Sequence, residues 1–410
     1  MTVAVGIEKI GAYPTTGVLD MSTLCEARGV DVSEVRDKLL VHQRGVNPPW
    51  EDAVTMAVNA GASLLSETDR EAIGLLIVAS ESAVDQEKPL SSWVHNYLGL
   101  TARCRNFEIK HACYGATGGL QLALSWLASA HARGRKALII STDQSLIALG
   151  QPYEPVTGAG AVAVLLSDAP RMIEYELDRC GYYSADVSDV FRPTPRVETG
   201  NSESSLFSYL EALEEAFDHY AEQAPDVLAE AGYFDWCVYH MPFAGMARRA
   251  HRTVLRRVRK YSSAEIAEDY DRRVHPSTRF AVQMGGVYGA STFVGLLGLI
   301  DGAPAVQANQ RIGIFAYGSG LCGEFQSAMI LPAARAVAAE TDLQAQLDAR
   351  RSLTLDEYEA AERERDANIM ARDFAPDRLA ADAWYIGQYE GRKRLILEEV
   401  QDYYRHYAWS

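Results

Sequence analysis

Short apolar runs alternate with helical patterns along most of the chain. Continuous apolar stretches, typical of strands buried on both faces, lie at Ile73 to Ser80, Ala137 to Thr142, Ala161 to Ser167, Trp236 to Tyr239 and Ile312 to Ala316. Between them, Tyr114 to His131 is an Ala- and Leu-rich helical pattern, and Arg248 to Lys260 is a basic one. Because strands and helices alternate, the pattern predicts an α/β layered protein.

The last part of the chain has a different pattern. Asp342 to Ala371 is highly charged and helical in period, and Gly391 to Tyr407 predicts a further amphipathic helix. No long linker, low-complexity stretch or internal repeat divides the sequence. We therefore expect appended helices over an α/β body.

One uncharged segment, Phe280 to Ile300, is about long enough to span a membrane. It also contains five glycines together with Gln283, Ser291 and Thr292. We interpret it as a Gly-rich turn followed by a buried helix, with a membrane span as the alternative.

Composition narrows the class of protein. The 410 residues are enough for a large core, and 48% apolar and 23% charged residues are ordinary for a globular protein. The net charge of −16 argues against nucleic acid as the main partner. The first residues lack the basic and apolar regions of a signal peptide, so we expect a cytoplasmic protein without a membrane anchor.

The six cysteines show no metal-site spacing and no CxxC pair, so we expect no metal and no disulfide. Cys113 is the exception among these small core residues. A short strand-like segment, Asn106 to Lys110, leads into it, and glycines and a long helix follow. At a helix start, free N–H groups and the helix dipole favour a thiolate and lower the thiol pKa. Cys113 is therefore a candidate nucleophile, and a buried structural cysteine is the alternative.

Two further polar residues directly follow predicted strands. Glu81 comes after Ile73 to Ser80, at the rim of the sheet where α/β active sites form, and an apolar pocket there would raise its pKa as a general base requires. His240 follows Trp236 to Tyr239 and can donate to a ketone or thioester oxygen. A helix-capping or solvated Glu81 and a structural His240 are the alternatives.

Together these segments resemble the 3-hydroxy-3-methylglutaryl-CoA (HMG-CoA) synthase family of the thiolase superfamily, over nearly the whole chain. The resemblance lies in Ala79-Ser-Glu-Ser82, Phe107-Glu-Ile-Lys-His-Ala-Cys-Tyr-Gly-Ala116, Glu154-Pro-Val-Thr-Gly-Ala-Gly-Ala161, His240-Met-Pro-Phe243 and Ala316-Tyr-Gly-Ser-Gly320. It is most similar to the branch acting in polyketide β-branching, by Glu51 to Ala60, Arg192 to Ser204 and the Tyr-Ala-Trp-Ser end.

The resemblance implies a thiolase fold of duplicated αβαβα layers. One half would span residues 1–170 and carry Glu81 and Cys113, and the other would span 171–410 and carry His240 with the appended helices. Homodimers are implied too, as are phosphopantetheine-linked substrates on donor and acceptor acyl carrier proteins (ACPs), with no separate cofactor.

Roles carry over residue by residue from the same resemblance. Cys113 matches the acylated nucleophile, Glu81 the base that removes an acetyl methyl proton, and His240 the acid that polarises the acceptor ketone. Asp143 matches an acid near the pocket, and Ser319 lies in the loop that completes the oxyanion hole.

The sequence departs from the family pattern at two places. Gly286 stands where an Asn is expected, so water or another residue must replace the side chain that helps hold the acceptor oxygen or orient His240. Gly245 stands where the mevalonate enzyme often has a Lys for CoA phosphate. The missing cation favours a carrier protein over free CoA.

A basic stripe, Arg248 to Lys260, carries seven Arg or Lys residues and no acid. It begins eight residues after His240. In an acidic protein such a patch would attract an acidic carrier protein, and Arg248, Arg249 and Arg252 could hold the phosphopantetheine phosphate. A solvated helix face paired with acids elsewhere is the alternative.

Three functions remain open on the sequence. The first is condensation of an acetyl unit with a β-keto thioester, on acyl carriers or, as in the mevalonate pathway, on CoA. The second is another thiolase-fold reaction, such as a ketoacyl synthase III-like condensation or acyl transfer. The third is a non-catalytic subunit. Glu81 favours the first over the second, because decarboxylation needs no carboxylate base, and Cys113 argues against the third.

Overall fold

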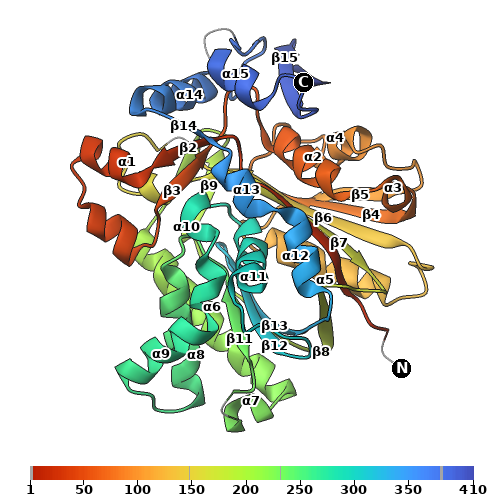
Figure 1. Cartoon of the computed structure of the whole chain (residues 1–410), viewed down its shortest axis with the longest axis vertical. Coiled ribbons are helices and arrows are strands. Elements are labelled where there is room, and N and C mark those ends of the chain that lie inside the picture. Colours follow the sequence, from red (N-terminus) through yellow and green to blue (C-terminus); the bar gives the residue numbers. More distant parts are fainter. Residues whose placement is uncertain (1–2, 147, 231, 379–381) are drawn as a thin grey trace.

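A nine-stranded mixed sheet runs through the molecule. The computed structural model describes residues 3–146, 148–230, 232–378 and 382–410 (Figure 1). The strand order is β11-β12-β13-β8-β1-β7-β6-β4-β5. The strands are β1 (Gly6–Tyr13), β4 (Ile73–Ala79), β5 (Arg105–Ile109), β6 (Lys136–Gln144), β7 (Ala159–Ser167), β8 (Ile173–Ser184), β11 (Trp236–Tyr239), β12 (Arg311–Gly318) and β13 (Cys322–Ile330). All five strands predicted from apolar runs are present.

The sheet has two parts that meet where β1 pairs with β8 over two residue pairs. Gly6 is required there, because a Cβ atom would overlap the carbonyl oxygen of Ile173. Strands β4, β5 and β6 are parallel in one part, and β11 and β12 are parallel in the other.

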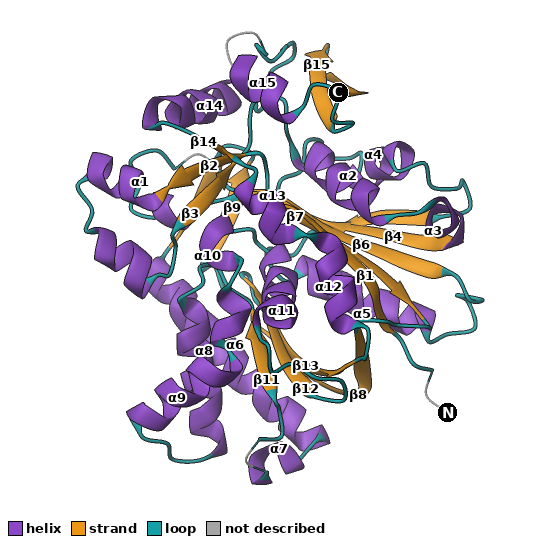
Figure 2. Cartoon of the chain, in the orientation of Figure 1, coloured by secondary structure: helices purple, strands orange, loops and turns teal. Residues whose placement is uncertain are grey.

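Helices form three layers around the two parts of the sheet (Figure 2). Helices α2 (Ala53–Leu64) and α4 (Leu90–Tyr97) cover one outer face, and α6 (Ser202–Gln223) and α8 (Met246–Val258) cover the other. Helices α5 (Gly115–Leu127) and α11 (Ala290–Gly302) lie between. This is the expected αβαβα layering, and the two predicted helices correspond to α5 and α8.

The uncharged segment is a buried helix, as expected. Helix α10 (Ala281–Met284) is followed by two glycines and then by α11, whose residues 290–300 are all buried. Among the described residues, no helix has the length and apolar character that a membrane span requires.

The remaining elements surround this body. They are α1 (Met21–Arg28), α3 (Glu67–Ala72), α7 (Asp226–Ala229), α9 (Ser263–Arg273), α12 (Ala334–Thr341), a small sheet of β2 (Gly17–Asp20), β3 (Gln43–Val46) and β14 (Arg351–Ser352), and the hairpin of β9 (Val190–Thr194) and β10 (Val197–Gly200). Asp342 to Ala371 is helical in two pieces, α13 (Leu343–Asp348) and α14 (Leu355–Asn368), on either side of β14.

The helix predicted over Gly391 to Tyr407 is wrong. After α15 (Asp382–Gln388), strands β15 (Leu395–Gln401) and β16 (Tyr404–Trp409) form an antiparallel hairpin. Asp402 and Tyr403 in its turn have φ of 48° and 68°. Positive φ at both central residues is the geometry of a tight two-residue hairpin turn, which ends any helix at this point.

Candidate functional site

Cys113 lies in the short loop between β5 and α5, two residues before the first residue of α5. Two glycines allow neighbouring loops to close on it. A Cβ atom at Gly289 would stand 2.7 Å from the carbonyl oxygen of Cys113, and one at Gly318 would stand 2.6 Å from the nitrogen of Tyr114. The starts of α5 and α11 and the end of β12 therefore converge on Cys113.

The expected lowering of the Cys113 pKa is wrong for the free protein. Burial raises the pKa of the thiol well above its usual range, and the negative charges of Asp143 and Glu81 raise it further. The thiol lies before the first turn of α5, and the dipole there does not outweigh these effects. Cys113 is therefore a protonated thiol at rest.

Glu81 follows β4, as predicted, and its side chain is close to the Cys113 loop. Burial raises the pKa of Glu81, while the backbone N–H groups of Ala112 and His111 and the charge of Lys110 oppose the rise. Carboxylate oxygen Oε1 is buried and has no hydrogen-bond partner among the described residues. Glu81 is thus a carboxylate with a raised pKa and, among the described residues, an oxygen without a partner, next to the Cys113 loop.

Asp143, at the end of β6, organises the backbone around Glu81. Its Oδ1 accepts hydrogen bonds from the Glu81 nitrogen at 2.8 Å, from Ser82 Oγ at 2.9 Å and from Ser80 Oγ at 3.3 Å. Burial and the charge of Glu81 raise the pKa of Asp143 to about 8. At neutral pH Asp143 is mostly protonated, so the neighbouring acids do not both carry full charge.

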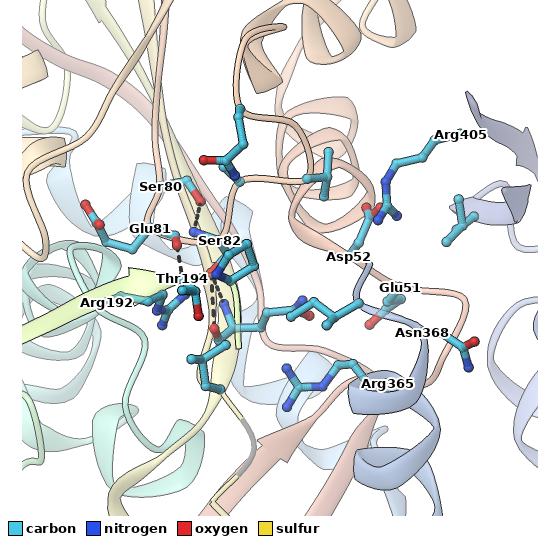
Figure 3. Close-up of a pocket in the computed structure, with 18 of the residues that line it drawn as sticks. Glu51, Asp52, Ser80, Glu81, Ser82, Arg192, Thr194, Arg365, Asn368 and Arg405 are labelled. Carbon is cyan, nitrogen blue, oxygen red and sulfur yellow. Dashed lines mark hydrogen bonds and ion pairs between the residues drawn. The ribbon is translucent and has the colours of Figure 1, made fainter. Parts of the chain in front are cut away.

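Arg192, on β9, supports Glu81 from the other side, and the sequence did not indicate it as a site residue. Its guanidinium donates to the Glu81 carbonyl oxygen at 2.8 Å, to Tyr288 Oη at 2.8 Å and to Glu198 Oε2 at 2.9 Å. Figure 3 shows Arg192 beside Glu81. One cation therefore holds the Glu81 loop and a tyrosine from the segment before α11.

A cavity of about 210 Å³ opens behind this loop, between the β9–β10 turn, α14 and the C-terminal hairpin. Figure 3 shows Glu81 and Arg192 at one end of it, with Arg405 and Asp52 at the other. Cys113 and His240, both described residues, do not line it. The cavity therefore adjoins the Glu81 loop without containing Cys113.

His240 follows β11 and is 1% exposed. Its Nδ1 is 2.8 Å from Ser291 Oγ on α11, and its Nε2 has no partner among the residues described. Burial lowers the pKa of His240 to about 3. Because Ser291 and Gly289 both belong to the start of α11, this segment joins the surroundings of His240 and Cys113.

The structure explains why Gly286 replaces a larger residue. Its N–H donates to the carbonyl oxygen of Val156 at 3.2 Å, and a Cβ atom would stand 2.5 Å from that same oxygen. Ser291, which the sequence did not indicate as a site residue either, contacts His240 Nδ1 and can orient the ring in place of the missing side chain.

Ser319 lies in the turn between β12 and β13, in the loop that reaches Cys113. Asp189 holds this turn by accepting from Tyr317 Oη at 2.6 Å and from the Gly320 N–H at 3.1 Å. The turn is therefore placed for the oxyanion role carried over for Ser319, which stays a prediction.

Arg248, Arg249 and Arg252 are exposed in the first turns of α8. Farther along the stripe, Arg257 pairs with Asp218 and Arg259 with Glu265. Within the described part of the chain, Arg249 and Arg252 have no acidic partner within ion-pair distance. Two of the four cations at the end of the stripe are therefore paired with acids, as the solvated-face alternative expects, whereas Arg249 and Arg252 at its beginning are not.

Two family models match most of the chain. Hydroxymethylglutaryl-coenzyme A synthase N terminal matches residues 2–170, and hydroxymethylglutaryl-coenzyme A synthase C terminal matches residues 251–406. Polyketide biosynthesis 3-hydroxy-3-methylglutaryl-ACP synthase PksG of Bacillus subtilis is 36% identical, over 99% of each chain. The chain belongs to the hydroxymethylglutaryl-CoA synthase family.

Solved structures of the family have the same fold. The HMG synthase of the curacin biosynthetic pathway, in complex with its holo donor-ACP, superposes with a TM-score of 0.92 at 36% identity, covering 99% of this chain and 100% of that one. MvaS in complex with 3-hydroxy-3-methylglutaryl coenzyme A gives a TM-score of 0.90 at 30% identity, over 100% of both chains. The predicted thiolase fold and family are confirmed, and membership makes the chain a condensing, acyl-transferring enzyme.

Proposed function

We propose that this enzyme condenses an acetyl unit, carried on Cys113, with a β-keto thioester bound to an acyl carrier protein, and so serves polyketide β-branching. The placement of Glu81 carries the proposal. A desolvated carboxylate with a free oxygen lies beside the nucleophile. Decarboxylating condensation has no use for such a base, whereas deprotonating an acetyl methyl group requires one.

The first half of the reaction is acyl transfer. Cys113 sulfur attacks the acetyl thioester, the bond to the pantetheine sulfur breaks, and the thiol proton leaves with the departing pantetheine thiol. N–H groups in the Cys113 loop and the Ser319 turn would hold the oxyanion. Glu81 does not take part in this half.

The second half forms the carbon–carbon bond. Glu81 removes a proton from the acetyl methyl group, and the resulting carbanion equivalent attacks the β-carbon of the acceptor while His240 polarises its ketone oxygen. Water then cleaves the Cys113 thioester. The product is a 3-hydroxy-3-methylglutaryl-type thioester that remains on the acceptor's carrier.

Carrier proteins, rather than free CoA, suit the surface near His240. No side chain fits at Gly245, because a Cβ atom would overlap the carbonyl oxygen of Lys38, so a cation for CoA phosphate has no room there. Arg249 and Arg252 lie four and seven residues after Gly245 and have no acidic partner among the described residues. Similarity to the PksG and curacin synthases, named for ACP substrates or partners, supports the same choice.

The assembly and chain organisation belong to the same proposal. We infer a cytoplasmic homodimer that needs no cofactor beyond its carrier-bound substrates, built from halves at 1–170 and 171–410. The free edge of β5, at the end of the sheet order, offers a surface for two-fold pairing. A monomer by light scattering at micromolar concentration would contradict the dimer.

Intact-protein mass spectrometry tests the reaction and its carrier. We expect an adduct of about +42 Da, one acetyl group in place of a hydrogen, faster from acetyl-ACP than from acetyl-CoA. Cys113→Ser should lose the adduct. Survival of the adduct in that variant would refute the assignment of the nucleophile. Efficient use of both CoA substrates would instead favour the mevalonate-type reaction on CoA; a relative from Enterococcus faecalis is named hydroxymethylglutaryl-CoA synthase.

Charge-reversal variants test whether the basic stripe binds the carrier protein, and a second pair with the same charge change serves as the control. Arg249→Glu with Arg252→Glu should slow transfer from ACP and flatten its salt dependence. Arg256→Glu with Lys260→Glu changes the charge equally at the other end of the stripe and should have a smaller effect. Equal effects from both pairs would make the attraction a general one and remove Arg249 and Arg252 as a docking site.

A further inference from the structure

Ser291 is the second residue of α11 and is 1% exposed. Its Oγ accepts a hydrogen bond from the Met241 N–H at 3.1 Å and lies 2.8 Å from His240 Nδ1. Ser291 therefore contacts both His240 and the next residue, Met241.

The hydroxyl proton of Ser291 decides which nitrogen of His240 is protonated. A hydroxyl has one donor and two acceptor positions, and the Met241 N–H uses one of the acceptor positions. Among the hydrogen bonds of the described residues, His240 Nδ1 is the remaining partner of Ser291 Oγ. A buried donor left without an acceptor is costly, so the hydroxyl donates to Nδ1, which then carries no proton.

The surroundings of His240 keep the ring neutral. Burial lowers its pKa to about 3, and a titratable side chain, Tyr209 of α6, lies nearby with ring centroids 6.4 Å apart. Burial raises the pKa of Tyr209, whose hydroxyl donates to the His240 carbonyl oxygen, so Tyr209 is uncharged as well. With Nδ1 unprotonated, a neutral ring must carry its proton on Nε2, the buried atom that lacks a partner.

We propose that Ser291 is a positioning residue that fixes the Nε2–H tautomer of His240, so that His240 serves as a neutral hydrogen-bond donor to the acceptor ketone. This rests on the proposed function. Because a neutral imidazole cannot give up this proton at ordinary pH, the new alkoxide takes its proton from the Glu81 acid formed when the acetyl methyl group was deprotonated. Protons balance: one leaves the methyl carbon and one arrives on the hydroxyl oxygen.

The glycine at position 286 makes the contact between Ser291 and His240 more important. No side chain extends from residue 286 to share the acceptor oxygen, and a Cβ atom there would overlap the space of the Val156 carbonyl. Which ring nitrogen of His240 carries the proton then depends on Ser291.

Nitrogen-15 NMR of the histidine-labelled, substrate-free protein tests the tautomer directly, with His240→Gln used for assignment. We expect a pyrrole-type shift for Nε2 and a pyridine-type shift for Nδ1. Both shifts should stay the same from pH 6 to pH 8, because a pKa of about 3 keeps the ring neutral over that range. A protonated Nδ1 in the wild type would overturn the proposal. No substrate is present, so this result is independent of whether Cys113 is acetylated.

Ser291→Ala tests the consequence for turnover. The Nδ1–H tautomer should become populated, and condensation should fall roughly 5- to 100-fold, the range expected for loss of one buried hydrogen bond, while acetylation of Cys113 is unchanged. Thr292→Val removes a hydroxyl from the next residue of α11 and should leave both tautomer and turnover unchanged. If Ser291→Ala keeps the Nε2–H tautomer, or if Thr292→Val has an equal effect, Ser291 does not position His240.

Discussion

The two sides of the Cys113 site differ in the charged and polar groups that surround the functional side chain. On the Glu81 side, Asp143, Arg192 and Glu198 form a network in which acids, a cation and hydroxyl groups contact one another. On the His240 side, the ring contacts Ser291 and otherwise lies among buried groups. We call the first side polar and the second dry, because among the described residues His240 is buried and its ring has one hydrogen-bond partner.

This difference sets the chemistry of each residue. Burial alone would hold both Glu81 and His240 neutral. The charge of Arg192 and the backbone N–H groups near Glu81 oppose that effect, so its pKa is raised while ionisation stays accessible. Nothing comparable opposes it at His240, whose pKa falls to about 3. In the proposed reaction, the polar side therefore moves protons through Glu81, and the dry side keeps one on His240.

Removing the base from the polar side should have the largest effect. Glu81→Gln should acetylate Cys113 normally but lose condensation by roughly 10²- to 10⁴-fold, the usual contribution of a general base. Glu108→Gln is the matched control, since Glu108 is another partly buried acid with a raised pKa in the wall of the same cavity. Condensation by Glu81→Gln at a near wild-type rate would place the base elsewhere.

On the dry side, the Asn side chain that the family pattern has at position 286 should not fit in this protein. Gly286→Asn brings a Cβ atom to 2.5 Å from the Val156 carbonyl oxygen, and overpacking of this kind costs about 1–3 kcal/mol. Urea unfolding should show the loss. Gly387→Asn, where a Cβ atom would meet open space, is the control. A Gly286→Asn protein as stable as the wild type, with faster condensation, would show that the dry side tolerates a second polar group.

Arg192→Gln should make the polar side more like the dry side. The positive charge of Arg192 lowers the pKa of Glu81, so its loss should raise that pKa further. Condensation requires ionised Glu81 and increases with pH, so its acid limb should move to higher pH and the rate at neutral pH should fall about 10-fold.

Acetylation of Cys113 should keep its wild-type pH profile in Arg192→Gln. Arg196→Gln, on the same hairpin, contacts backbone carbonyls of Asp366 and Ala367 and should leave both profiles in place. An acid limb that does not move would show that Arg192 acts only on the structure of the loop.

The sequence predicted the elements whose signal is local. Buried strands such as β4 and β6 are continuous apolar runs, and Glu81 and His240 could be located because they directly follow strands. The hairpin β15–β16 was missed because only Asp402 of its two turn residues is a type that tolerates positive φ, and Tyr403 stands where a glycine usually follows.

Contacts between distant segments could not be predicted in this way. Arg192 reaches Glu81 across 111 residues of sequence, and Ser291 reaches His240 across 51. The direction of the Cys113 pKa shift also depends on such contacts. Its sequence neighbours indicate a helix start and a lowered pKa, but acids from other strands and loops, together with burial, raise it.

The smallest effect should come from Asp143→Asn, which keeps an oxygen to accept the bonds from Glu81 and Ser82 but removes the charge. In the wild type, Asp143 ionises as pH rises through about 8, and its negative charge then disfavours the Cys113 thiolate. The variant escapes this effect. Iodoacetamide should therefore alkylate Cys113 faster in Asp143→Asn, by a margin that is small at neutral pH and widens above pH 8, after subtraction of the rate in Cys113→Ser. A margin that stays constant with pH would mean that Asp143 does not titrate near 8 beside the thiol, and that the charges restraining Cys113 are those of Glu81, Glu198 and Asp189.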